Sequence, residues 1–217
     1  RTIDSDKASP PSEVKQFKSR NESKDTTHYS IIDKEGNAVS NTYTLGLSFG
    51  SGVTIPGTGI LMNSQMNNFA YRYEDKNEIG RAASPGNRFE PGKKPMSTMA
   101  PTIVFDKDNK LFLVTGSPGG SDIPAAILRV VTGVIDFNLD IGEATMLPRI
   151  HKDWPYTGLE HERAVSRDIV RRLKSMGHET EYEMTIGSTQ SIHVVDGVNT
   201  GFADLRRPNA GVSVQSN

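Results

Sequence analysis

The chain has 217 residues, a length that suits one domain, or most of one, with a real hydrophobic core. Its 25 basic and 26 acidic residues give a net charge of −1, which favours neither nucleic acid nor an anionic membrane, and no apolar run could span a bilayer. Cysteine is absent, which excludes a thiol nucleophile, a disulfide framework and a cysteine-based zinc site.

The first segment, residues 1–25, is rich in Lys, Asp, Ser and Pro. Val14 and Phe17 are almost its only large apolar side chains. A segment of this composition buries too little apolar surface to order itself, so we predict a flexible tail before a folded domain over 26–217.

A β-hairpin is predicted next, from two β-rich runs over 27–33 and 37–45 that flank a Lys-Glu-Gly-Asn turn. Pairing Asp33 with Asn37 across the turn fixes the register and puts Thr26 opposite Thr44. Directly opposite side chains have Cβ atoms about 4.5 to 5.5 Å apart. A slip of one residue would turn the two threonines to opposite faces. By itself, such a pair is usually only a good cross-strand contact.

Residues 46–50 satisfy the G-x-S-x-G pattern of the α/β-hydrolase nucleophile elbow. That elbow must run from a strand directly into a helix, and the glycines and proline of 51–57 exclude a helix here. We therefore predict a loop and reject Ser48 as the nucleophile. The loop also lacks the ending of a phosphate-binding loop and the spacing of a dinucleotide fingerprint, so no nucleotide cofactor is expected.

A short buried strand is predicted over 59–63, followed by a long polar connection over 73–94. A second hairpin is predicted from 102–105 and 110–115, around the turn at 106–109.

The glycine-rich run 116–120 leads into a helix whose apolar stripe contains Ile123, Ile127, Val130 and Val134. We predict Ser121 as its N-cap, with Pro124 in the first turn. Unpaired N–H groups and the positive end of the helix dipole then collect beside Gly119 and Gly120.

The remaining elements complete an alternation of strand pairs and helices. Asp140 with Glu143 predicts a capping box for a short helix, and a second, amphipathic helix is predicted over 166–176. Two more strands are expected, over 190–195 and 200–204. The pattern indicates an α+β fold.

Several motifs resemble one family, at matching order and spacing. They are TTHYS at 26–30, TYTL at 42–45, STM at 97–99, GSPGGS at 116–121 and GSTQSI at 187–192. Together they resemble the small subunit of γ-glutamyltransferases (glutathione hydrolases), which are N-terminal-nucleophile hydrolases. The resemblance covers residues 26 to about 207 and implies the small-subunit share of a four-layer αββα sandwich.

The resemblance also implies processing of a longer precursor. Family precursors cut themselves before a nucleophilic threonine, which corresponds to the bond between Asp25 and Thr26. Residues 1–25 would then be the tail of the large subunit and 26–217 the catalytic small subunit of a heterodimer. A periplasmic or extracellular location is implied in the same way.

Acyl transfer needs a nucleophile, a base and an oxyanion site. A freed Thr26 supplies the hydroxyl and, with a reference pKa near 8, an α-amine that accepts its proton. The resemblance assigns Thr44 to a hydrogen bond with Thr26, and the N–H groups of Gly119 and Gly120 to the oxyanion. No histidine is required, and none shows metal-ligand spacing, so no metal is expected.

The donor pocket departs from the family. The resemblance assigns Gln65 and Ser97 to the α-amino and α-carboxylate groups of the glutamyl donor, and Thr98 replaces a serine of this site while keeping a hydroxyl. Two further contacts differ, because Gly46 replaces an asparagine and Asn68 replaces an aspartate. Exchanging a carboxylate for an amide removes a charge-assisted hydrogen bond worth about 1.5 to 3 kcal/mol.

The leading hypothesis is a threonine-dependent γ-glutamyl hydrolase/transferase whose small-molecule donor is glutathione by default. One alternative is a related acylase of the glutaryl or cephalosporin type. Another is a non-catalytic, unprocessed homologue. No cofactor and no nucleic-acid partner is expected for any of them.

Overall fold

The computed structural model describes residues 26–69, 85–153 and 158–215. The chain divides into two compact units. Among the described residues, unit 1 comprises 45–69, 85–97, 150–153 and 158–184, and unit 2 comprises 26–44, 98–149 and 185–215. The predicted tail over 1–25 and much of the predicted connection over 73–94 lie outside the described residues.

Unit 2 begins with the predicted hairpin, formed by β1 (Thr27–Ile32) and β2 (Ala38–Tyr43). Thr27 pairs with Tyr43, and the N–H of Asp33 donates to the carbonyl of Asn37 at 3.0 Å across the turn. The predicted register is therefore confirmed. Carried one step beyond the ladder, it sets Thr26 opposite Thr44.

A four-stranded antiparallel sheet follows in the order β3-β4-β8-β9. Its strands are β3 (Thr102–Phe105), β4 (Leu111–Gly116), β8 (Gln190–Val195) and β9 (Val198–Ala203). The second predicted hairpin is confirmed. Strand β9 begins two residues earlier than predicted because Asp196 and Gly197, both with positive φ, form a two-residue hairpin turn.

Two helices complete unit 2, α1 (Ile123–Ile135) and α2 (Ile141–Met146). The predicted N-cap Ser121 is wrong, because a 3₁₀ turn over Gly120–Asp122 leads into α1 and moves the cap position to Asp122. The capping box of α2 is confirmed: Asp140 accepts from the Glu143 N–H at 2.8 Å, and Glu143 accepts from the Asp140 N–H at 3.3 Å.

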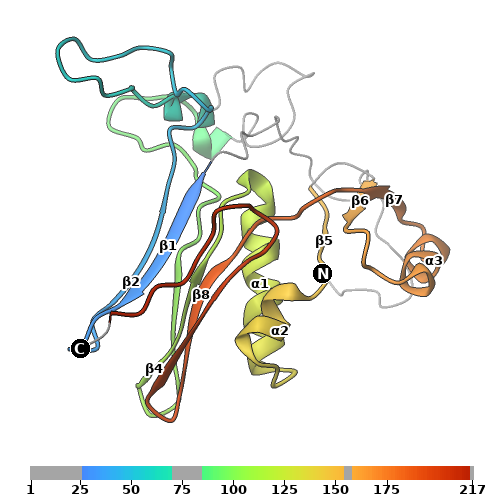
Figure 1. The fold of residues 1–217 in the computed structure, drawn as a ribbon. Helices are drawn as coiled ribbons and strands as arrows, with labels where there is room; N and C mark the ends of the chain where they lie inside the picture. The colour runs from blue at the N-terminus through green and yellow to red at the C-terminus, as the bar shows by residue number, and fades with distance from the viewer. Residues whose placement is uncertain (1–25, 70–84, 154–157, 216–217) are drawn as a thin grey trace. The chain divides into compact units, whose positions relative to one another are not determined.

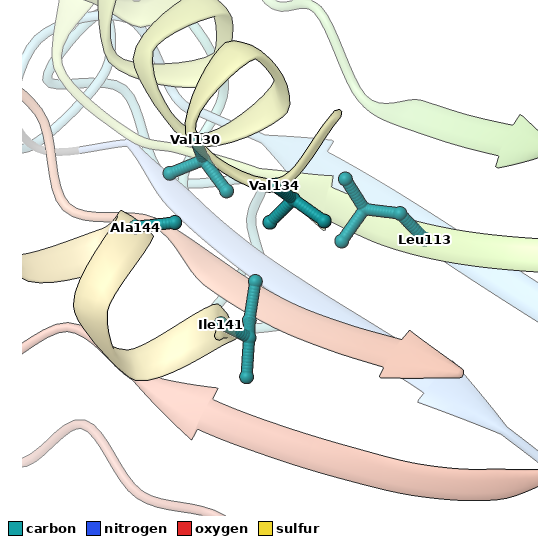
Figure 2. Packing of buried hydrophobic residues seen from close by; sticks show 5 residues of the cluster. All are labelled: Leu113, Val130, Val134, Ile141 and Ala144. Carbon is teal, nitrogen blue, oxygen red and sulfur yellow. The ribbon is translucent and has the colours of Figure 1, made fainter. Parts of the chain in front are cut away.

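These elements form three layers (Figure 1). The β1–β2 hairpin packs on one face of the four-stranded sheet, and α1 and α2 pack on the other. Between the helices and the sheet lies a buried cluster of apolar side chains, Leu113, Val130, Val134, Ile141 and Ala144 (Figure 2). The predicted α+β class is confirmed.

Unit 1 contains a smaller sheet in the order β5-β6-β7. Its strands are β5 (Ile150–His151), β6 (Gly158–His161) and β7 (Glu179–Tyr182). The parallel strands β6 and β7 are joined by α3 (Arg167–Ser175), whose N-cap Ser166 accepts from the Ile169 N–H at 3.3 Å. The helix was predicted from the sequence, whereas the sheet was not.

The rest of unit 1 has little regular structure within the described residues. Two short 3₁₀ turns span Gln65–Asn68 and Pro85–Asn87. The buried strand predicted over 59–63 is wrong: only an isolated pairing of Thr54 with Leu61 forms, and Ile60 and Met62 are 59% and 50% exposed. Across the described ranges, no helix is long and apolar enough to cross a membrane.

Candidate functional site

Thr26 is 3% exposed and directly precedes β1 in unit 2. Side chains alternate between the two faces of a strand, so Thr26 shares a face with His28 and Ser30. That face is turned toward the four-stranded sheet, because the Ser30 hydroxyl donates to the carbonyl of Gln190 at 2.8 Å. The predicted nucleophile is therefore a buried side chain between two sheets.

The His28 ring brings the start of β1 against the end of β4. A Cβ atom added at Gly116, the last residue of β4, would overlap the imidazole ring. Thr26 is two residues before His28, and Gly119 is three residues after Gly116. The packing of His28 on Gly116 therefore holds the segment that contains Thr26 beside the glycine-rich run 116–120, which we call the glycine loop.

Hydrogen bonds fix the tautomer of His28. The Ser30 hydroxyl uses its proton on Gln190, so at 3.1 Å it accepts from Nε2–H of His28. Nδ1 then accepts from the hydroxyl of Thr42 at 2.7 Å. Burial lowers the pKa of His28 to about 4. A neutral imidazole with both nitrogens occupied is a structural link between β1 and β2.

On one side, the glycine loop packs against a second glycine segment around Gly187. Gly119 and Gly120 have φ values of 139° and 62°, a backbone path that glycine takes without strain. A Cβ at Gly119 would lie 3.0 Å from Cα of Gly187, so the two backbones are in close contact. The N–H of Ser188 donates to Oγ of buried Ser117 at 2.8 Å, which ties this second glycine segment to the loop.

A buried ion pair stabilises the same region and was not predicted. Arg149 and Asp204 have fully buried side chains, with 2.7 Å between Nη2 and Oδ2. Asp204 also accepts from the N–H of Thr189 at 2.9 Å, and Arg149 donates to the carbonyl of Ile186 at 2.8 Å. Both partners therefore hold the segment that packs on Gly119.

A cavity of about 420 Å³ in unit 2 reaches Thr26. Its wall includes Thr26, Pro118 of the glycine loop, Gln190 of β8 and the segment 207–213 after β9. Nη1 of Arg207 donates to the carbonyl of Thr26 at 3.1 Å. No local sequence pattern pointed to Arg207, because its partner is 181 residues away along the chain.

The predicted site residues are divided between the two units. Thr26, Thr44, Thr98, Gly119 and Gly120 belong to unit 2. The other predicted donor-binding residues, Gly46, Gln65, Asn68 and Ser97, belong to unit 1.

Within unit 1, two of the predicted donor-binding residues contact one another. The Asn68 amide donates to Oε1 of Gln65 at 2.8 Å. Gly46 has φ of 91°, and a Cβ there would overlap Oγ of Ser64. That hydroxyl is held in place, because it accepts from the N–H of Leu47 at 3.0 Å and donates to the carbonyl of Leu45 at 3.2 Å.

In the part of the chain that the structure describes, no group of three or more His, Asp and Glu side chains could hold a metal ion.

The chain resembles known proteins along most of its length. The sequence model of the family described as Gamma-glutamyltranspeptidase matches residues 1–214. The glutathione hydrolase proenzyme of Escherichia coli K12 is 44% identical over 206 residues, or 94% of this chain. That alignment spans only 35% of the length of the E. coli protein.

Solved structures share the fold. A threonine-to-alanine mutant of Helicobacter pylori gamma-glutamyltranspeptidase is 39% identical with a TM-score of 0.76, and the match covers 83% of this chain and 100% of that one. Cephalosporin acylase from Bacillus halodurans is 27% identical with a TM-score of 0.75, and the match covers 88% of this chain and 34% of that one.

Proposed function

The chain belongs to the gamma-glutamyltranspeptidase family, and we propose that it carries the catalytic part of a threonine-dependent γ-glutamyl hydrolase/transferase. The proposed precursor cuts itself before Thr26 and then cleaves γ-glutamyl amides, glutathione among them, through an ester on Thr26. The acyl group passes to water or to an amine.

The position of Thr26 carries the proposal. It is a buried hydroxyl residue at the first position before β1, next to a cavity that the glycine loop also lines. The match covers all of the solved H. pylori chain but 83% of this one, so part of this chain has no counterpart there, as would be the case for a separate small subunit. These observations support a new chain end at Thr26.

Processing would begin with attack of the Thr26 hydroxyl on the carbonyl carbon of Asp25. The C–N bond breaks as an ester forms, and water then hydrolyses the ester to leave a carboxylate on Asp25 and a free amine on Thr26. A peptide nitrogen has no useful basicity, whereas a free α-amine with a reference pKa near 8 can accept a proton. Cleavage is therefore the step that activates the enzyme.

In each turnover, Thr26 Oγ attacks the donor carbonyl while its own amine takes the hydroxyl proton. The N–H groups of Gly119 and Gly120 stabilise the resulting oxyanion, and loss of one such donor typically costs about 10²- to 10³-fold in rate. Thr44, opposite Thr26 in the hairpin register, orients the hydroxyl or the amine. The protonated Thr26 amine then returns the proton to the leaving group.

Donor recognition is assigned to Gln65, Asn68, Ser97, Thr98 and Gly46. The α-carboxylate and α-amine of a glutamyl group need donors and acceptors of this kind. Residues 1–25 would end the large subunit, which supplies the rest of the pocket and pairs with 26–217 as a heterodimer. We further propose a periplasmic or extracellular location.

A related acylase is the second candidate, for a specific reason. Asn68 has an amide, which donates to Gln65, where the family has a carboxylate that could accept from the substrate ammonium. Gly46 has no side chain to contact that ammonium. A donor without an α-amine, such as a glutaryl amide, loses nothing at these positions. The structural likeness to a cephalosporin acylase is consistent with this candidate.

Two measurements test the proposal. Full-length protein is run on a denaturing gel, and the smaller fragment is sequenced; it should begin at Thr26, and Thr26→Ala should remain one band. If wild type stays as a single band, the chain is the non-catalytic homologue. The processed protein is then given γ-glutamyl- and glutaryl-p-nitroanilide, and faster turnover of the glutaryl compound would favour the acylase.

A further inference from the structure

We propose that Arg207 is a positioning residue for the nucleophile: it anchors the Thr26 carbonyl, and its fixed charge keeps the freed Thr26 amine available as a base. The inference rests on the proposed function, because it requires Thr26 to become a chain end. It adds a residue from outside the motifs that indicate the family.

The contact is direct. Nη1 of Arg207 lies 3.1 Å from the Thr26 carbonyl oxygen, and the arginine is half-buried. Arg207 follows β9 and begins the segment 207–213, which lines the 420 Å³ cavity together with Thr26. Both ends of the contact belong to unit 2.

Anchoring matters most after the cut. A freed Thr26 loses its covalent attachment on the amino side, and unattached chain ends fray unless they are tied down. The carbonyl is the remaining main-chain group through which Thr26 can be held without occupying the amine or the hydroxyl. A hydrogen bond from a charged guanidinium is stronger than one between neutral groups, which suits this task.

The charge has a second effect. Covalent geometry keeps the nitrogen and carbonyl oxygen of one residue within about 4 Å of each other, so a guanidinium on the oxygen is also close to the amine. Arginine is always protonated. A nearby positive charge disfavours the ammonium form, and an amine must be unprotonated to act as a general base. Arg207 therefore extends activity to lower pH.

Few other ionisable groups face this cavity. Among the described lining residues, β1 contributes His28, which burial keeps neutral near pH 7, and the phenol of Tyr29. Strands β8 and β9 and Pro118 contribute no ionisable side chain to the wall, and the segment after β9 contributes Arg207. The arginine is thus the dominant charge of the described wall.

The test compares Arg207→Gln with Arg207→Lys, which keeps the charge. The matched control is Lys34→Gln, which removes a cation from the turn at the opposite end of the same hairpin, where the side chain is 89% exposed. Each full-length protein is checked for cleavage by gel and N-terminal sequencing. The pH dependence of kcat/KM is then measured with γ-glutamyl-p-nitroanilide, or with the glutaryl compound if that is the better donor.

We expect the acidic limb of the Arg207→Gln profile to move up by about 0.5 to 1 pH unit, which lowers the rate at pH 6 about 3- to 10-fold and leaves pH 9 nearly unchanged. Arg207→Lys and Lys34→Gln should keep the wild-type limb. The acetylation rate of the Thr26 amine, followed by mass spectrometry against pH, should shift in the same direction without depending on turnover.

Other results overturn the inference. An unchanged limb, an equal loss at every pH, or the same shift in Lys34→Gln rejects a role for this charge. If the Arg207→Gln protein is not cleaved but the Arg207→Lys protein is, the result supports anchoring by a positive charge. If neither variant is cleaved, the inference is rejected. Wild type that is not cut before Thr26 rejects the proposed function as well, whereas a cut, active wild type with unaffected variants rejects this inference alone.

Discussion

His28 shows how one side chain couples the nucleophile strand to the sheet behind it. Its two nitrogens contact Thr42 and Ser30, and Ser30 continues to Gln190. Burial lowers its pKa from 6.5 to about 4 in the folded protein. The unfolded chain therefore takes up a proton on His28 near pH 6.5, whereas the folded chain takes it up only near pH 4. The contribution of neutral His28 to the free energy of unfolding is therefore complete above pH 6.5 and decreases as the pH falls toward 4.

We expect the urea midpoint of wild type to fall between pH 7.5 and pH 5, and His28→Gln to show a smaller fall. His161→Gln is the control, because that half-buried histidine lies in unit 1. An equal pH dependence in wild type and His28→Gln would contradict the assignment of the proton to His28.

The side chain at position 68 is expected to influence which donor the enzyme prefers. Asn68→Asp restores a carboxylate that can accept from a donor ammonium, a charge-assisted bond worth about 1.5 to 3 kcal/mol. We expect kcat/KM for γ-glutamyl-p-nitroanilide to rise tens-fold relative to the glutaryl compound. Asn67→Asp, an exposed neighbour, controls for charge alone. An unchanged ratio would mean that the ammonium is held elsewhere.

The predictability of the site differed from residue to residue. Thr26, Gly119 and Gly120 lie in motifs that resemble those of the family, so the sequence alone suggested roles for them. Arg149 and Asp204 were missed because charged residues are usually exposed, and their contact joins positions 55 residues apart. No periodicity or spacing encodes such a pair.

Among the elements, the hairpins were predictable and the small sheet was not. A short turn at Asp33 and Asn37 fixes the register of β1 and β2, and a one-residue slip would expose the buried face. By contrast, β5 has two residues, and β6 and β7 have four each without clear alternation. The parallel pairing of β6 and β7 depends on the crossover through α3, which a local pattern does not specify.

Gly46 and Ser64 form a matched pair within the loop of unit 1. Gly46→Asn adds a Cβ where Oγ of Ser64 lies and forces asparagine to φ of 91°. We expect a loss of about 1 to 3 kcal/mol in the free energy of unfolding, measured by urea titration. Adding Ser64→Ala removes the overlap and should recover about 1 kcal/mol of that loss.

Gly52→Asn is the matched control for this pair. Gly52 also has positive φ, at 74°, but an added Cβ would meet no atom within 4 Å. It should therefore show the cost of backbone strain alone. If Gly46→Asn costs no more than Gly52→Asn, then Ser64 does not restrict the loop, and the family's asparagine could be accommodated at position 46.

At the scale of the whole molecule, the described layers supply a preformed setting for Thr26. The β1–β2 hairpin packs on the four-stranded sheet, and the helices cover the opposite face of that sheet (Figure 1). The apolar cluster between sheet and helices stabilises the sheet on which the hairpin lies (Figure 2). The proposed cleavage before Thr26 should therefore require folded protein and nothing else.

We expect cleavage of purified full-length precursor to be first-order, with the same rate constant over a hundredfold range of protein concentration, because attacking hydroxyl and scissile carbonyl belong to one chain. Thr26→Ala should abolish it, and Thr44→Ala should slow it about tenfold or more by releasing the hydroxyl from its partner. Urea above the unfolding midpoint should stop it reversibly. A rate that rises with concentration, or with added wild type acting on Thr26→Ala, would identify cleavage between molecules and remove the role of this fold in its own activation.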